Sequence, residues 1–303
     1  MRRYLAALDE RDFRRLFVGA SISSLGDGMS FVALAWLVVN RPHGTTELGL
    51  LAVCYTGPVF VGGWLAGVLL DRFDKRKVLA ADCAVRGAAF ASIPILQLVG
   101  HGPSWLVFGV AGIYGLFKMV PLAGFPSVIP DLVRDENLDA ANALEGLSYG
   151  TSGIVGPALA GLLLMPLGAA NVLLLDATSY LVFGWLSLSI SQPLRSAPAL
   201  RGKDTTLTDV MKLLVTDIPI VSTTAALMTF NVAEGMLLVI TPWLAHRNLG
   251  GAAGLGLLLS VMSAGEFAGS AIAGTWSLRR SLLGIGASEL LASVGFVTLL
   301  ASI

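Results

Sequence analysis

The chain has 303 residues, of which 55% are hydrophobic and 13% are charged, against roughly 45–50% and about 25% in soluble proteins. This composition argues against a soluble globular domain. The 20 Lys and Arg residues balance the 20 Asp and Glu residues, so no bulk charge would attract nucleic acid. The high hydropathy also excludes a disordered chain.

Nine apolar runs each have about the length that crosses a bilayer as a helix, roughly 20 residues. In chain order they cover about residues 14–39, 48–70, 77–99, 104–126, 140–165, 170–191, 219–243, 252–277 and 282–303. Strands are not expected, because the sequence lacks ten-residue segments that alternate between apolar and polar residues. The sequence thus predicts an all-α, polytopic membrane protein built from transmembrane helices.

The basic residues gather in alternate connections between these runs. Sixteen of the 20 fall on one side, which holds the N-terminal segment, the 71–77 loop and the 192–212 segment. Arg41 and Arg247 fall on the other side, and two more lie within the runs. By the positive-inside rule we expect a cytoplasmic N-terminus in a multi-pass protein of the cell (inner) membrane.

A shift of 207 residues aligns the sequence with itself from about residue 25 to residue 82. The shift places Asp27 on Glu234 and Asp82 on Glu289. Charged residues are rare inside membranes, so two matches between carboxylates are hard to attribute to composition. We therefore expect two parallel repeats of six helices each.

The repeat predicts the domain organisation. An N-terminal six-helix half would cover residues 1–191, a cytoplasmic linker 192–215, and an incomplete C-terminal half of three helices 216–303. A complete second copy would need about 111 further residues. We therefore expect the chain to hold about nine of twelve transmembrane helices.

The segment after the second run reads Gly67-Val-Leu-Leu-Asp71-Arg72-Phe-Asp-Lys75-Arg76-Lys77. It resembles the G-x-x-x-D-R-x-G-R-R/K signature of the major facilitator superfamily of secondary transporters, with Asp74 in place of the usual glycine. The resemblance implies that Gly67, Asp71, Arg72 and Arg76 form a gating motif that closes the cytoplasmic side in one state. A basic loop with one acid is also what topology alone requires.

Two further segments are similar to the branch of that superfamily that contains bacterial macrolide and siderophore exporters, the transmembrane secretion effectors. They are the opening 12–17 and the stretch 129–143. The resemblance implies a major facilitator fold and efflux by an antiporter, that is, proton-coupled export of a small amphipathic molecule by alternating access. The partners would be this small-molecule substrate, protons and the lipid bilayer. A uniporter or importer, or a non-transporting membrane protein or inactive fragment, remains open.

Residues 153–161 resemble the glycine-proline signature of proton-driven antiporters. Pro157 removes a backbone donor and would kink the helix, while Gly156 would admit a neighbouring helix. The segment would then act as a gate or a seal. Close packing of small residues explains the same pattern equally well.

Acidic residues within the apolar runs are the candidates for proton coupling. In the superfamily the first and seventh helices line the central cavity, so the resemblance would place Asp27 and Glu234 on opposite walls, with Glu266 as a further cavity residue. A low dielectric disfavours the charged form of a carboxylate, which is the chemistry of a proton-coupled step. Both acids could instead be structural. Asp82 and Arg86 are four residues apart and predict a structural ion pair.

Enzymatic motifs are missing from the sequence. His43, His101 and His246 are far apart and lack the spacing of metal ligands. The sequence has no nucleophile elbow, no phosphate-binding glycine loop and no H-E-x-x-H motif. We therefore predict that the protein is not an enzyme and needs no cofactor and no metal.

Overall fold

The computed structural model describes residues 2–100, 103–191, 194, 216 and 218–273, and these residues contain helices and no strand. The chain divides into two compact units. The first unit holds Met1–Pro198 with Leu238–Ala264, and the second holds Ala199–Leu237 with Gly265–Ile303. The boundaries expected from the repeat, at 191 and 216, stay predictions.

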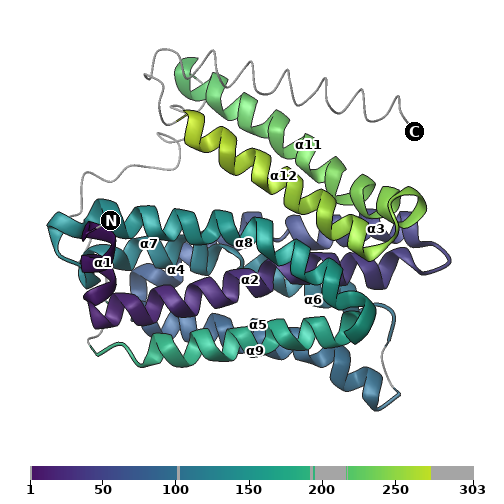
Figure 1. The fold of residues 1–303 in the computed structure, drawn as a ribbon, viewed down its shortest axis with the longest axis horizontal. Helices are drawn as coiled ribbons and strands as arrows, with labels where there is room; N and C mark the ends of the chain where they lie inside the picture. Colours follow the sequence, from purple (N-terminus) through teal and green to yellow (C-terminus); the bar gives the residue numbers. More distant parts are fainter. Residues whose placement is uncertain (1, 101–102, 192–193, 195–215, 217, 274–303) are drawn as a thin grey trace. The chain divides into compact units, whose positions relative to one another are not determined.

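The helices follow the predicted apolar runs closely (Figure 1). They are α1 (Arg2–Asp9), α2 (Arg11–Val39), α3 (Gly44–Thr56), α4 (Val59–Arg72), α5 (Lys75–Leu98), α6 (Leu106–Phe117), α7 (Met119–Leu132), η1 (Asp135–Asn137), α8 (Leu138–Leu167), α9 (Ala169–Leu188), α11 (Ile218–Asn248) and α12 (Ala252–Ala273). The ninth predicted run, 282–303, lies outside the described residues. The all-α prediction is confirmed.

Six helical segments of the described residues are long and apolar enough to cross a membrane. They are Arg11–Val39, Gly44–Arg72, Lys75–Leu98, Leu106–Leu132, Asp135–Leu167 and Ala169–Leu188. They correspond to the first six predicted runs. The seventh and eighth runs are occupied by the helices α11 and α12.

Prolines account for the details that the apolar pattern missed. The second segment is divided into α3 and α4 at Gly57 and Pro58, and the fourth into α6 and α7 at Lys118. Pro121 in the first turn of α7 cannot donate to the carbonyl of Phe117, which weakens the helix at this joint. The predicted end of the fourth run at residue 126 was wrong, because α7 continues through Pro126 to Leu132. Membrane helices tolerate such prolines because neighbouring groups satisfy the freed carbonyls.

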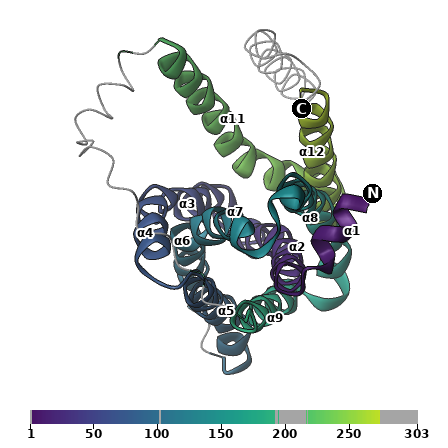
Figure 2. The same ribbon diagram turned by 90° about the vertical axis from the view of Figure 1, so that its left-hand side faces the viewer.

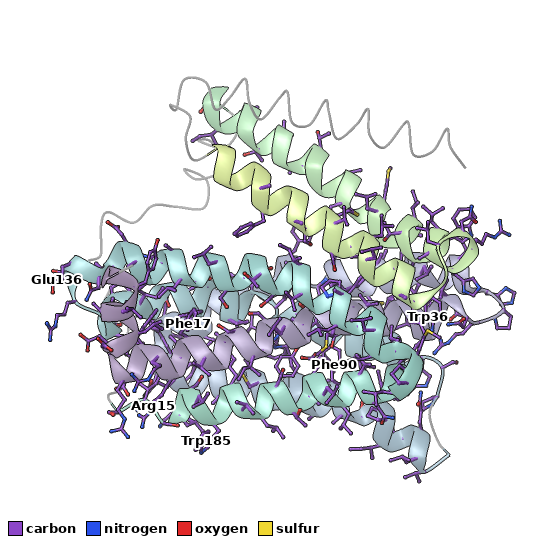
Figure 3. The ribbon with its side chains drawn as sticks, viewed as in Figure 1. Arg15, Phe17, Trp36, Phe90, Glu136 and Trp185 are labelled. Atoms are coloured by element: carbon purple, nitrogen blue, oxygen red, sulfur yellow. The ribbon has the colours of Figure 1, made fainter. Side chains whose placement is uncertain are left out.

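Within the first unit α2 lies at the centre of the helix packing. It packs along both α8 and α9, and α5 packs along the other side of α9. The end-on view in Figure 2 shows these four helices side by side. Figure 3 shows Arg15 and Glu136 at one end of the bundle and Trp36 at the other.

The contact between α2 and α8 depends on two glycines. A Cβ atom added at Gly28 would lie 2.9 Å from the Ser152 carbonyl oxygen and 3.1 Å from the Gly156 Cα. A Cβ atom at Gly156 would lie 2.8 Å from the Gly28 Cα. The two backbones therefore approach each other as closely as glycine permits, which is the usual way that membrane helices gain packing energy.

Replacement of Gly28 by valine should force α2 and α8 apart. We expect Gly28→Val to lower the free energy of unfolding by about 1–3 kcal/mol, the usual cost of overpacking, seen as a lower midpoint of thermal unfolding in detergent. The matched control is Gly146→Ala on the exposed face of α8, where an added Cβ meets nothing within 4 Å. Equal midpoints for Gly28→Val and the unchanged chain would contradict this packing.

Candidate functional site

A buried arginine lies at the centre of the first unit. The Arg86 side chain on α5 is 0% exposed and that of Asp82, one turn earlier, is 1% exposed. Arg86 Nε donates to both carboxylate oxygens of Asp82, at 3.0 and 3.1 Å, and Nη2 makes a further bond to Oδ2. The structure thus brings together the two residues that the spacing paired.

The same guanidinium binds a second carboxylate, from α2. Arg86 Nη1 lies 3.3 Å from Asp27 Oδ1 and 3.4 Å from Oδ2. The hydroxyl of Tyr180 on α9 donates to Asp27 Oδ1 and accepts from Arg86 Nη1 at 3.2 Å. The guanidinium also stacks over the Tyr180 ring, 4.4 Å from its centroid. Asp27, Asp82, Arg86 and Tyr180, the buried ion cluster, therefore connect α2, α5 and α9.

Asp27 is the most accessible member of this cluster. Its side chain is 25% exposed, whereas those of Asp82 and Arg86 are almost fully buried. It lines a small cavity of about 40 Å³. The other lining residues are Ala20, Ser23, Ser24, Pro121, Leu122, Phe125, Glu145, Ser148, Tyr149 and Phe183. A carboxylate in this position contacts a buried cation on one side and a small cavity on the other.

A third carboxylate lies one helical turn from Tyr180. Asp176 on α9 is 0% exposed, and it accepts hydrogen bonds from the Ser30 hydroxyl on α2 and, at 3.1 Å, from the Ser179 hydroxyl. Asp27 and Ser30 on α2 thus pair with Tyr180 and Asp176 on α9. The sequence analysis assigned no role to Asp176 or Tyr180. Asp176 and Tyr180 are four residues apart and therefore lie on one face of α9. This spacing was the sequence signal that could have indicated a polar face.

The charges of the buried ion cluster do not cancel when both of its acids are ionised. Asp27 and Asp82 then carry two negative charges and Arg86 one positive charge, which leaves one negative charge at the cavity. An unbalanced charge inside a membrane protein is costly. Of the two acids, Asp27 is the one that lines the small cavity.

The basic loop after α4 is held by Asp74, the residue that departs from the superfamily pattern. Its carboxylate accepts from the Arg76 backbone N–H at 3.1 Å, which caps α5, and binds Arg76 Nη2 at 2.7 Å. It also accepts from the backbone N–H of Leu194 at 3.2 Å, while Arg76 Nη1 donates to the Ile190 carbonyl at 2.7 Å. Asp74 and Arg76 therefore fasten the loop to the chain that follows α9.

The environment of Asp74 acts on its pKa in two directions. Burial raises the pKa, but the hydrogen bonds from Arg76 and from the Leu194 backbone, with the Arg76 charge, outweigh burial. The pKa of Asp74 therefore lies below its ordinary value of 3.8. The carboxylate is ionised at neutral pH.

The other members of the predicted gating motif are Gly67, Asp71 and Arg72, and they are not closely packed against the described residues. Asp71 and Arg72 are exposed, and an added Cβ at Gly67 would meet nothing within 4 Å in the described part of the chain. Among the described residues, Arg76 is the member of the gating motif that forms side-chain hydrogen bonds, with Asp74 and Ile190. The gating role of the motif stays a prediction.

The remaining predicted residues lie apart from this cluster in the chain. Glu234 is exposed on α11, and Glu266 belongs to α12 with a side chain outside the described residues. The expected position of Glu234 opposite Asp27 stays a prediction. Pro157 lies inside α8, which continues to Leu167, and Gly156 makes the close contact with Gly28.

The described helices are those of a multi-pass membrane protein, and the comparison with known families identifies the family. The sequence pattern of the transmembrane secretion effectors, a family of the major facilitator superfamily, matches residues 3–303. The chain belongs to this family and is a multi-pass membrane protein.

Among known proteins the chain is similar to exporters of a siderophore. It is 28% identical over 290 residues to the enterobactin exporter EntS of Shigella boydii serotype 18. It is 27% identical over 290 residues to the enterobactin exporter EntS of Escherichia coli O1:K1. Each alignment covers 94% of this chain and 62% of the relative, so the chain spans less than two thirds of the length of the proteins that it matches.

Removal of the buried cation should destabilise the protein strongly. Arg86→Met leaves Asp82 and Asp27 without their positive partner, and breaking a buried ion pair costs about 3–5 kcal/mol. We expect a large fall in the midpoint of thermal unfolding in detergent, and partial recovery in the double variant Arg86→Met with Asp82→Asn. The control is Arg41→Met, which breaks a more exposed pair with Glu47 worth about 0–1 kcal/mol. Equal effects of Arg86→Met and Arg41→Met would contradict the central role of the cluster.

The Asp74 contacts should give a stability contribution that acid removes. Because the pKa of Asp74 is lowered by folding, this contribution is fully present above pH 3.8 and is lost as the pH falls through the lower pKa of the folded protein. We expect Asp74→Asn to reduce the unfolding midpoint at pH 6, and the difference from the unchanged chain to shrink below about pH 3.8. Glu136→Gln, at an exposed site on η1, should show neither effect. A difference that grows on acidification would contradict the assignment.

Proposed function

We propose that the protein is a secondary active transporter of the bacterial inner membrane that exports a small amphipathic molecule in exchange for protons, by alternating access. The family membership and the similarity to enterobactin exporters support export and a siderophore-like, macrolide or drug-like substrate. The concentration of basic residues at one predicted side supports a cytoplasmic N-terminus.

The position of Asp27 is the observation that carries the proton-coupling proposal. Its carboxylate binds a fully buried guanidinium and also lines a small cavity that contains the polar side chains of Ser23 and Glu145. The ionised form accepts bonds from Arg86 and Tyr180. Proton binding at Asp27 would weaken its bond to Arg86, and Asp82 would still balance the guanidinium. The step therefore changes the net charge of the cluster by one without leaving Arg86 unpaired.

In this mechanism the loss of charge at Asp27 loosens the link between α2 and the α5–α9 pair. Tyr180 is a positioning residue that holds the ionised carboxylate, and Asp82 with Arg86 is the structural ion pair. In the C-terminal half, Glu234 is the proposed counterpart of Asp27, and Glu266 is a further proposed cavity residue.

Two motifs would control access to the cavity. Gly67, Asp71, Arg72 and Arg76 would close the cytoplasmic side. The Gly156-Pro157 segment of α8 would seal the opposite state through its contact with Gly28.

Neutralising Asp27 should separate exchange from proton-driven transport. We expect Asp27→Asn, which imitates the protonated acid, to abolish enterobactin accumulation driven by a pH gradient in everted vesicles. Exchange of labelled for unlabelled enterobactin at equal pH should persist, because it needs no change in protonation. The measurement is the uptake of labelled enterobactin with and without a protonophore.

The control for this experiment is Asp139→Asn, at an exposed site in the first turn of α8, which should transport as the unchanged chain does. Gradient-driven uptake that is normal in Asp27→Asn would contradict proton coupling at this residue. Uptake by the unchanged chain that a protonophore does not affect would instead identify a uniporter.

A further inference from the structure

We infer that the groove between α4, α5, α6 and α7 binds an anionic phospholipid, with its phosphate between Arg72 and Lys77 and an acyl chain along the apolar wall. The groove has a volume of about 530 Å³, within the range of about 300–1,000 Å³ typical of ligand sites. Its lining residues are Leu69, Arg72, Phe73, Asp74, Lys77, Val78, Ala81, Asp82, Val85, Phe117 and Val120. This inference does not rest on proton coupling.

The groove has a charged end and an apolar end. Arg72 is the last residue of α4 and Lys77 lies in the first turn of α5, so both cations stand where the chain turns between the two helices. Val85 lies two helical turns further along α5, and Phe117 is at the end of α6. A ligand that fills the groove must therefore combine a polar headgroup with a hydrocarbon part.

The charges of the lining residues favour an anion. Asp74 is neutralised by Arg76, and Asp82 by Arg86. Arg72 and Lys77 are exposed and form no ion pair in the part of the chain that the structure describes. The groove therefore presents two uncompensated positive charges, which suit a phosphate group.

The exposure of the apolar residues favours a lipid over a soluble anion. Phe73 is 57% exposed and Val85 is 40% exposed, and Val85 lies on a helix that is long and apolar enough to cross the membrane. Apolar side chains at the surface of such a helix contact acyl chains in the bilayer. A phospholipid would place its hydrocarbon against Val85 and its phosphate at the membrane surface.

The groove also reaches the buried ion cluster. Asp82 lines its wall and is the carboxylate that binds Arg86 most closely. An acyl chain in the groove would cover this wall and keep water away from the Asp82–Arg86 pair. Lipid binding would therefore stabilise the ion pair on which the helix packing depends.

Lipid binding can be measured without transport. The purified chain in detergent is titrated with fluorescent phosphatidylglycerol or fluorescent phosphatidylcholine, and anisotropy is recorded. We expect tighter binding of phosphatidylglycerol. Each cation contributes about five-fold to affinity, so Arg72→Gln with Lys77→Gln should weaken phosphatidylglycerol binding by about 25-fold.

A matched control removes two positive charges elsewhere. Arg11→Gln with Arg134→Gln, both at exposed positions, should leave phosphatidylglycerol binding unchanged. A similar loss of phosphatidylglycerol affinity in the control would show that general charge attraction causes the effect, and it would contradict a specific site. So would phosphatidylglycerol binding that survives the loss of Arg72 and Lys77.

A second variant tests the hydrocarbon part of the groove. Ala81→Trp fills the groove from its exposed wall and keeps both cations, so it should also weaken phosphatidylglycerol binding. Soluble glycerol 3-phosphate should fail to displace the fluorescent lipid. Displacement by glycerol 3-phosphate at equal concentration, or normal lipid binding in Ala81→Trp, would show a site for a soluble anion and contradict the proposal.

Discussion

The packing of the first unit depends on one buried guanidinium. Arg86 is fully buried and binds Asp82 on its own helix and Asp27 on α2, while the Tyr180 ring of α9 covers its face. A buried cation is costly unless its partners are well placed. The three helices must therefore keep the register that brings these groups together, and Ser30 with Asp176 adds a second polar link between α2 and α9.

The same arrangement gives the proposed transport mechanism its physical basis. In the proposed mechanism Asp82 remains paired with Arg86 when Asp27 is protonated. The protonation of Asp27 therefore weakens the link between α2 and α5 without leaving Arg86 unpaired. The basic loop, held by Asp74, lies at the N-terminal end of α5, about two helical turns before Asp82. The lipid groove runs between them and borders both Asp74 and Asp82. The helix α5 thus contains the Asp82–Arg86 ion pair, begins next to the Asp74 contacts that hold the basic loop, and forms one wall of the groove.

Much of the fold could be predicted from the sequence, because membrane helices are recognised from the length and hydropathy of apolar runs. The first six apolar runs correspond to the six segments that the structure describes as long and apolar enough to cross a membrane. The pairing of Asp82 with Arg86 could be predicted as well, since it depends on spacing within one helix. The end of the fourth run could not, because hydropathy alone does not show whether a helix continues through Pro126.

The rest of the candidate site depends on helix register, which the sequence alone does not contain. Asp27 and Arg86 are 59 residues apart, and Asp27 and Tyr180 are 153 apart. Nothing in the local pattern around Asp27 indicates these partners. The neighbouring serines do not bind its carboxylate, since Ser24 donates to the Ala20 carbonyl and Ser30 to Asp176.

The most direct test of proton binding at Asp27 is infrared difference spectroscopy of the purified protein at fixed pH, with and without enterobactin as a probe for the proposed siderophore-like substrate. The account predicts a change in the carbonyl stretch of a protonated carboxylic acid that disappears in Asp27→Asn and persists in Asp139→Asn. A band that is unchanged in Asp27→Asn would contradict it.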